Sequence, residues 1–303
     1  MPLISKSVVV EASQVGRVDR IVQGLAGCSR SQVRGLFDHH CVRVNDAICL
    51  DFGLAIQLGD RVSLRFDPNQ RYREKKVWRD ATFSIVFEDR DLIVVDKAAH
   101  VLSVPTAQGE TNTLVERVSN YLRHHGVVRN ALVVHRLDRG VSGLMVFAKT
   151  HESASRLHAQ FRDHTPRRTY LALVHGRLPA DEGTFRSHLA TAKNLDRFST
   201  SQPGGGELAI THYRVLQQLP EAAFVEVRLE TGRRNQIRVH FAEAGHPVLG
   251  DRRYGRGNIG PSTWTAKRLA LHAASLGFVH PTTGEQLEFI SPLPKEMATL
   301  VKK

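Results

Sequence analysis

The sequence predicts an α+β fold with a mixed, mainly antiparallel sheet, preceded by a small α/β module. Strand-like apolar runs outnumber helical patterns, and only some of them alternate with helices. A polar stretch, DPNQRYREKK at 67–76, has almost no apolar residues and carries several basic ones. Such composition is typical of a linker. We therefore expect a module at 1–66, a basic, flexible linker at 67–79 and a larger domain at 80–303.

The first module combines two helices with short strands. A helical pattern covers Val18–Leu25, and a second helix is expected to begin after Ser29, because Gln32 three residues on completes a capping box. In that helix the apolar positions share one face, while Arg30 and Arg34 share another. A strand and turn at 41–46 and a last strand from Gly59 complete the module.

The larger domain is predicted mostly from runs rich in Val, Leu and Ile. Residues 150–164 have the spacing of an amphipathic helix, and the Gly- and Pro-containing segment 201–207 is expected to be a mobile surface loop. The expected strands are two runs within 83–97 separated by 88–90, then 131–134, 144–148, 167–176, 208–216 and 224–230.

The charge and composition of the chain narrow the classes of molecule that it could bind. The net charge is +12, which favours a polyanion such as nucleic acid, although charge alone does not separate RNA from DNA or from a membrane surface. No apolar run approaches the ~20 residues that span a bilayer. Cys28, Cys41 and Cys49 fit no zinc spacing, and we interpret them as reduced packing residues of a cytoplasmic protein. We expect no metal site and no membrane association.

The most informative segment is His135-Arg136-Leu137-Asp138, which lies between two predicted strands. A carboxylate at such a junction is held by a rigid sheet and can face a cleft, which suits a catalytic acid, base or nucleophile. An isolated Asp in a loop would more often pair with a neighbouring arginine, here Arg136 or Arg139. The surrounding motifs favour the catalytic interpretation.

Those motifs occur in order along the chain: DLIVVDK at 91–97, HRLDRGVSGLMVFAK at 135–149, RTYLALVHG at 168–176, TGRRNQIRVH at 231–240, GHPVLGD at 245–251 and RLALHA at 268–273. Together they resemble the RluA-type pseudouridine synthases over residues 80–295. The first module is similar to the S-four-like RNA-binding domain, through RVD at 17–19, SRS at 29–31, VRVN at 42–45 and GD at 59–60.

The resemblance implies isomerisation of uridine to pseudouridine in RNA, most of all in large-subunit ribosomal RNA and otherwise in transfer RNA, by a monomer that needs no cofactor. It implies that Asp138 is the essential carboxylate, that Arg238 pairs with it, and that Tyr170 stacks on the flipped uracil. Arg136 is expected to occupy the gap left by the base, and Leu271 to form an apolar wall. Arg234 and Arg238 are expected to lie on one helix that begins after Gly232 and to face the cleft together. Arg30, Arg34 and Arg43 are the expected RNA contacts of the first module.

Two other functions remain open on the sequence. Gly140 and Val141 replace the Asp or Glu and the Thr that usually follow the catalytic Asp and its Arg in this family, and Gly140 is expected to add flexibility there. A catalytically weak or inactive RNA-binding or ribosome-assembly factor is therefore the alternative. A DNA-binding protein is a third possibility that rests on charge alone.

Overall fold

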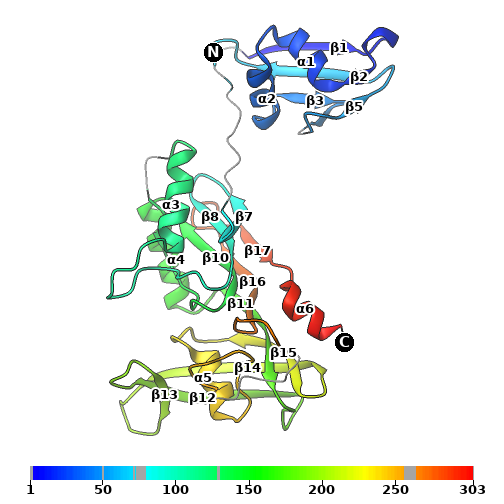
Figure 1. Cartoon of the computed structure of the whole chain (residues 1–303). Helices are drawn as coiled ribbons and strands as arrows, with labels where there is room; N and C mark the ends of the chain where they lie inside the picture. Colours follow the sequence, from blue (N-terminus) through cyan, green and yellow to red (C-terminus); the bar gives the residue numbers. More distant parts are fainter. Residues whose placement is uncertain are drawn as a thin grey trace. The chain divides into compact units, whose positions relative to one another are not determined.

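The structure is a computed structural model that describes residues 3–49, 51–70, 72, 80–127, 130–255 and 264–302. The chain divides into two units, Met1–Arg79 and Asp80–Lys303. Each unit has its own sheet and is described by itself (Figure 1). Most of the expected linker, residue 71 and residues 73–79, lies outside the described residues.

The first unit packs two helices against a four-stranded antiparallel sheet with the order β1-β6-β3-β4. A separate two-stranded pair joins β2 and β5. Its elements are β1 (Ile4–Val9), the 3-10 helix η1 (Ala12–Gln14), β2 (Gly16–Arg17), α1 (Val18–Ala26), α2 (Arg30–Asp38), β3 (Val42–Val44), β4 (Ala47–Ile48), β5 (Ala55–Ile56) and β6 (Arg61–Phe66).

Local sequence signals explain where α2 begins and which face it buries. The capping box is formed as expected, with the Ser29 amide donating to Gln32 Oε1 at 3.1 Å. Leu36 and Phe37 are almost fully buried in the core, and all three cysteines are free thiols that pack in or against it. Tyr72, inside the expected linker, is also buried there, and its hydroxyl accepts from the Asp67 amide at 2.8 Å. The chain is thus packed against this unit as far as Tyr72.

The second unit is built on one eleven-stranded sheet with the order β13-β12-β14-β15-β11-β16-β10-β8-β7. In addition, β17 pairs with β16 and β9 with β10. The strands are β7 (Phe83–Glu88), β8 (Leu92–Lys97), β9 (Leu132–Val133), β10 (Ser142–Ala148), β11 (Arg167–His175), β12 (Glu182–Thr191), β13 (Arg197–Thr200), β14 (Glu207–Gln218), β15 (Ala222–Leu229), β16 (Leu271–Val279) and β17 (Gln286–Ile290).

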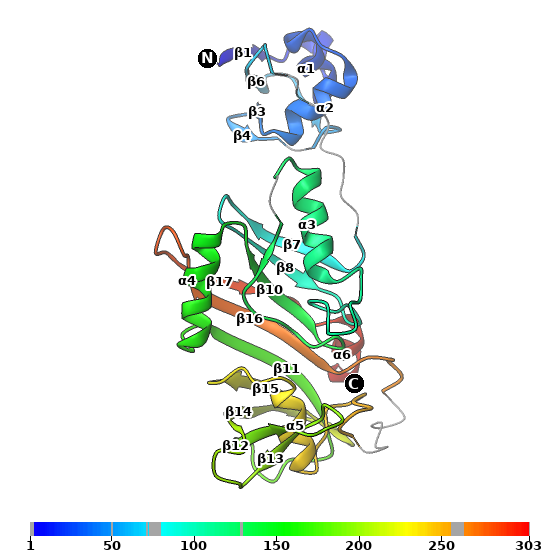
Figure 2. The ribbon, with the colours of Figure 1, turned by 90° about the vertical axis from the view of Figure 1, so that its left-hand side faces the viewer.

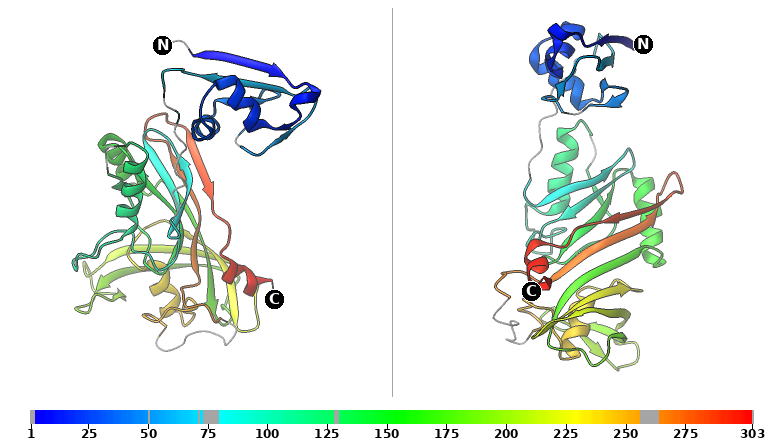
Figure 3. Two further views of the ribbon diagram at one scale, coloured as in Figure 1. Left: turned by 45° about the horizontal axis from the view of Figure 1, so that its top comes forward. Right: turned by 90° about the vertical axis from the view of Figure 1, so that its right-hand side faces the viewer.

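Four helices accompany this sheet. These are α3 (Leu114–His124), α4 (His151–Arg162), α5 (Gln236–Glu243) and α6 (Lys295–Val301). Tyr121 of α3 meets the ring of Phe83 on β7, and α4 packs on β10 (Figure 2). At the other end of the sheet α5 packs against β13 and β14, while α6 follows β17 to the end of the chain (Figure 3). None of the helices in the described part of the chain is long and apolar enough to cross a membrane.

A single parallel pairing, between β10 and β16, interrupts an otherwise antiparallel sheet. Gly143 permits it. The φ of Gly143 is 115°, and a Cβ there would lie 2.3 Å from the backbone oxygen of Ala273. No other residue type fits this close approach of two backbones. The pairing matters because β10 follows Asp138 directly and β16 begins at Leu271.

The predicted mixed, mainly antiparallel α+β architecture is confirmed. Helix α4 lies within the predicted 150–164, and the strands predicted at 144–148, 167–176, 208–216 and 224–230 all form. The strand predicted at 131–134 is reduced to Leu132–Val133, because its pairing with β10 extends over only those positions. Residues 201–206 form turns between β13 and β14, as the loop prediction requires.

Candidate active site

One pocket of the second unit gathers the predicted site residues from separate parts of the chain. Asp138 lies in the turn that precedes β10, Tyr170 on β11, Arg238 on α5 and Leu271 at the start of β16. The pocket is lined by Arg136, Leu137, Asp138, Val141, Arg168, Tyr170, Leu229, Gly232, Arg233, Arg234, Asn235, Gln236, Ile237, Arg238 and Leu271. Tertiary structure therefore brings together residues that are far apart in the sequence, from Arg136 to Leu271.

A guanidinium shared by two carboxylates forms the centre of the site. Nη1 of Arg238 lies 3.2 Å from Oδ2 of Asp138. The same side chain binds Asp251 in bidentate fashion, with Nε to Oδ2 at 2.7 Å and Nη2 to Oδ1 at 2.8 Å. Asp251 is fully buried, whereas one fifth of the Asp138 side chain is exposed. Asp251 thus anchors Arg238, and Arg238 presents its remaining nitrogen to Asp138.

The surroundings keep Arg238 charged. Burial by itself would lower the pKa of Arg238, but the hydrogen bonds and charges of Asp251, together with Asp138, outweigh it and raise that pKa above its ordinary value. The ring of Tyr254 lies 5.0 Å from the guanidinium and adds a cation–π contact. Arg238 therefore presents a permanent positive charge to Asp138.

Tyr170 forms an aromatic wall of the pocket. Its side chain is almost completely buried, and burial raises the pKa of its hydroxyl, so the phenol keeps its proton at neutral pH. The register of β11 with β16 places Tyr170 opposite Ala273. Leu271, two residues earlier on β16, lines the same pocket and is buried, as an apolar wall requires.

One expectation about the arginines is wrong. Helix α5 begins at Gln236, so Arg234 precedes the helix and does not share a helical face with Arg238. Asn235, the N-cap residue, adopts the left-handed conformation with φ 58°, which interrupts any earlier helical turn. Arg234 still lines the pocket, but it is exposed and its Nη2 donates to the Leu195 carbonyl at 2.7 Å. Arg136 is also exposed at the pocket.

The turn after Asp138 is held by packing and backbone contacts. The Val141 amide donates to the Asp138 carbonyl at 3.1 Å, and Val141 is buried in the pocket wall. A Cβ on Gly140 would lie 2.7 Å from Cδ1 of Leu269. Gly140 therefore allows a close approach of Leu269. The flexibility expected at Gly140 stays a prediction.

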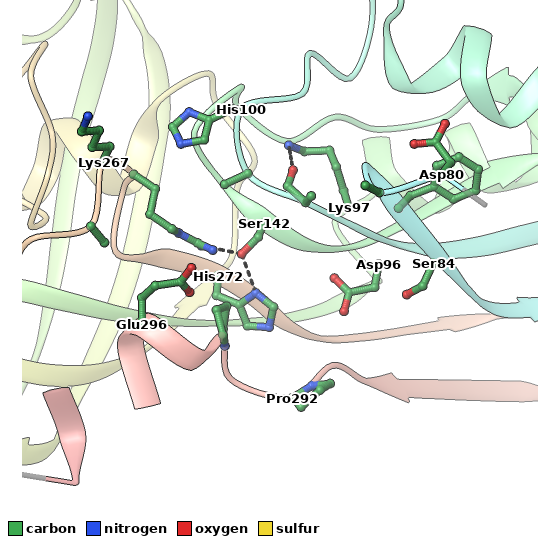
Figure 4. A pocket seen from close by; sticks show the side chains of 17 residues that line it. Asp80, Ser84, Asp96, Lys97, His100, Ser142, Lys267, His272, Pro292 and Glu296 are labelled. Carbon is green, nitrogen blue, oxygen red and sulfur yellow. Dashed lines mark hydrogen bonds between the residues drawn. The ribbon is translucent and has the colours of Figure 1, made fainter. Parts of the chain in front are cut away.

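A second cavity, of about 670 Å³, lies on the opposite face of the same strands (Figure 4). Ser142 and His272 line it, whereas the preceding residue of each segment, Val141 or Leu271, lines the pocket that contains Asp138. Ser142 Oγ accepts from Arg268 Nη2 at 2.6 Å and lies 2.8 Å from His272 Nδ1 (Figure 4). These contacts brace the parallel pair behind Asp138.

Lys97 supports the catalytic turn from this second cavity. Its fully buried ammonium donates to the carbonyls of Ala98 and Val101 at 2.9 Å each, and lies 3.5 Å from that of Arg139. Burial lowers the pKa of Lys97 to about 7, an effect that the negative charge of Asp138 partly offsets. Lys97 thus binds the backbone directly after Asp138.

The histidines beside the site have structural partners. Nε2 of His135 accepts from the Val146 amide at 3.0 Å, and its ring stacks on Phe161 with centroids 4.5 Å apart. His240 lies within 3.0 Å of the hydroxyls of Thr211 and Ser187. Among the described residues, no group of His, Cys, Asp and Glu side chains is arranged to hold a metal ion.

Sequence reasoning assigned no role to three residues that the structure connects with the site: Asp251, Lys97 and Arg168. All three lie inside the motifs quoted above, so the signal was present. Their function depends on what each side chain contacts across the fold, which neither spacing nor periodicity reveals.

In the first unit the three expected RNA-contacting arginines are exposed. Arg30 and Arg34 lie on α2, and the guanidinium of Arg34 faces the ring of Phe52 at 5.4 Å. Arg43 lies on β3 and donates to the Asp46 carbonyl at 2.7 Å.

Comparison with known proteins agrees with this geometry. Residues 91–243 match the family model described as RNA pseudouridylate synthase. "Ribosomal large subunit pseudouridine synthase D" of Zymomonas mobilis is 36% identical over 98% of this chain and 97% of its own length. The chain belongs to the RNA pseudouridine synthase family. Its activity is that of an isomerase, and the enzyme class expected from the motifs is confirmed.

Two further proteins resemble this pseudouridine synthase, one in sequence and one in fold. "Uncharacterized RNA pseudouridine synthase YlyB" of Bacillus subtilis is 35% identical over 97% of this chain and 96% of its own length. The solved structure of "Human RNA Pseudouridylate Synthase Domain Containing 4" is 22% identical, with a TM-score of 0.60. It covers 72% of this chain and 92% of the human one, and it shows the shared fold.

Proposed function

We propose that this pseudouridine synthase modifies ribosomal RNA of the large subunit and that Asp138 is its essential carboxylate. The observation that carries the proposal is the ion pair between Asp138 and Arg238 in a pocket that also contains Tyr170 and Leu271. A carboxylate paired with a guanidinium beside an aromatic wall suits a reaction at the sugar carbon of an extruded nucleotide. Asp138 either attacks that carbon or removes a sugar proton.

The other pocket residues are proposed to bind the extruded nucleotide and its neighbours. Tyr170 stacks on the uracil, and Leu271 packs against its edge. Arg136 and Arg234, both exposed at the pocket, contact the surrounding RNA, with Arg136 in the gap that the base leaves. No step of this scheme calls for a metal ion or a cofactor.

Ribosomal RNA is the proposed substrate for two reasons. The relative from Zymomonas mobilis carries that substrate in its name and matches nearly the whole chain, and the net charge of +12 favours a structured polyanion. The exposed Arg30, Arg34 and Arg43 of the first unit are proposed to contribute RNA contacts, in keeping with its likeness to the S-four-like domain. Monomeric state and a cytoplasmic site of action belong to the same proposal.

The test is a pseudouridine map of ribosomal RNA incubated with the purified protein. We expect at least one new pseudouridine with the unaltered chain and none with Asp138→Asn. Asp163→Asn is the matched control, because Asp163 is exposed and pairs only with Arg162 among the ion pairs of the described residues. A map without new sites, identical for the unaltered chain and Asp138→Asn, contradicts the proposal.

The Asp138→Asn variant also tests the alternative of an inactive RNA-binding factor. That alternative rested on Gly140 and Val141, yet the turn they form is buttressed by Leu269 and by the backbone bond to Asp138. If Asp138→Asn binds ribosomal RNA and supports ribosome assembly as well as the unaltered chain does, the assembly function is favoured.

A further inference from the structure

Arg168 adds a further positive charge to the catalytic pocket. It lies on β11 two residues before Tyr170, so both side chains point to the same face of the sheet. Both line the pocket. The charge of Arg168 also acts on the ionisation of Tyr170 and His135. Its side chain therefore lies near the aromatic wall.

Two nitrogens of the Arg168 guanidinium have unused hydrogen-bonding capacity. Its Nε and Nη2 are buried, and neither has a hydrogen-bond partner among the described residues. The guanidinium meets the face of Phe161 at 5.7 Å, which supplies a weak cation–π contact and accepts no directed hydrogen bond. Buried donors without acceptors are costly and rare in native proteins, and they mark positions where a ligand completes the site.

Gly232 makes room for this arrangement. A Cβ at position 232 would lie 2.6 Å from Nη1 of Arg168. The absence of a side chain at Gly232 therefore allows the guanidinium to reach the pocket wall between β11 and the segment before α5.

The hydrogen-bond acceptor that suits the two nitrogens of Arg168 is the uracil base and not a phosphate of the RNA backbone. A phosphate stays with the RNA chain, and the exposed Arg234 is available to it. The buried nitrogens of Arg168 lie next to the wall on which the uracil is proposed to stack. Uracil offers two carbonyl oxygens, and each can accept a hydrogen bond from a guanidinium N–H.

We propose that Arg168 donates hydrogen bonds to a carbonyl oxygen of the uracil and stabilises negative charge on the base while it is detached. This inference rests on the proposed function. When the C1′–N1 bond breaks, both electrons remain on the base, and the charge spreads to its carbonyl oxygens. The electron-deficient C1′ of the ribose is neutralised when Asp138 bonds to it or removes the C2′ proton. After rotation C5 bonds to C1′ while the Asp138–C1′ bond breaks or, on the other route, while Asp138 returns the proton to C2′. The proton lost from C5 is balanced by one gained at N1.

The first experiment compares Arg168→Gln with the unaltered chain in single-turnover conversion of the ribosomal RNA. We expect the rate to fall about 10²- to 10³-fold, as for other donors that stabilise developing charge. The dissociation constant for RNA and its salt dependence should stay nearly unchanged, because no phosphate contact is removed. Arg234→Gln is the matched control and should instead weaken binding and reduce the salt dependence.

The second experiment uses RNA with 5-fluorouridine at the target position. Fluorine withdraws electrons and stabilises the detached base, so breakage of the C1′–N1 bond should depend less on Arg168. We expect the loss caused by Arg168→Gln to shrink by about tenfold or more for this substrate, about one pKa unit of interaction. A purely structural role would slow both substrates equally.

Gly232→Ala extends the test with Arg168 still present, because the added methyl group displaces the guanidinium. Its effect on rate should be clear in the unaltered chain and small in Arg168→Gln, as for coupled positions. The inference is overturned if Arg168→Gln changes affinity and salt dependence but not the rate, or if both substrates lose activity equally. Absence of pseudouridine with the unaltered chain would instead refute the proposed function.

Discussion

Replacing Asp251 by Asn should weaken the anchoring of Arg238. Asp251 receives both Nε and Nη2 of Arg238 and also accepts at Oδ1 from the amides of Arg253 and Tyr254, at 3.0 and 3.1 Å. The amide of Asn keeps one acceptor and turns the other into a donor. The substitution therefore removes a charge and one of the two guanidinium contacts, with almost no change in volume.

The magnitude follows from burial. The Asp251 side chain is 0% exposed and that of Arg238 is 11% exposed, so solvent cannot replace the lost contact. A charge-assisted hydrogen bond contributes about 1.5–3 kcal/mol, and breaking a buried pair costs about 3–5 kcal/mol. Because Arg238 keeps its contact with Asp138, we expect the free energy of unfolding to fall by about 3 kcal/mol.

The assay is urea unfolding of both chains, followed by single-turnover conversion of RNA. Asp196→Asn is the matched control, because Asp196 pairs with Arg253 at the surface, where both side chains are about two-fifths exposed, and should change stability by less than about 1 kcal/mol. We also expect Asp251→Asn to slow conversion more than it weakens RNA binding, since Arg238 keeps its contact with Asp138 but is held there by one fewer hydrogen bond. Equal stability and equal rates for Asp251→Asn and the unaltered chain would refute the role of Asp251 as an anchor.

Three further outcomes are expected. Gly143→Ala should destabilise the second unit by about 3 kcal/mol or more, because its Cβ meets a backbone oxygen of Ala273 at 2.3 Å; a melting temperature within 1 °C of the unaltered chain contradicts this. Burial lowers the pKa of His135 to about 3, so the unfolded state binds more protons than the folded state between about pH 3 and 6.5. Stability should therefore fall as the pH drops through this range, by at most about 3 kcal/mol at pH 4. His135→Gln should reduce this dependence of stability on pH. Burial lowers the pKa of Lys97 to about 7. Between about pH 7 and 10.5 Lys97 is therefore protonated in the unfolded chain but not in the folded one, so the stability of the unaltered chain relative to Lys97→Met should rise with pH in this range. A stability difference that does not change with pH would argue against the shift.

Local sequence signals were sufficient where one segment determines its own structure. The capping box of Ser29 and Gln32 correctly marked the start of α2, and the apolar runs marked β10, β11 and β15. The start of α5 was misplaced, because Asn235 takes a left-handed conformation that its sequence neighbours do not reveal. The short β9 was overestimated, because the extent of a strand depends on its partner.

The sequence by itself determined the family, through ordered motifs around Asp138, Tyr170 and Arg238, and it determined the α+β class through the number and spacing of apolar runs. Only the tertiary structure decided that Arg238 is held by Asp251, that Gly143 admits β16 beside β10, and that Arg168 enters the pocket with unused donors. The reason is physical. Secondary structure follows from neighbours along the chain, whereas charge pairing and desolvation depend on which atoms from distant segments meet in space.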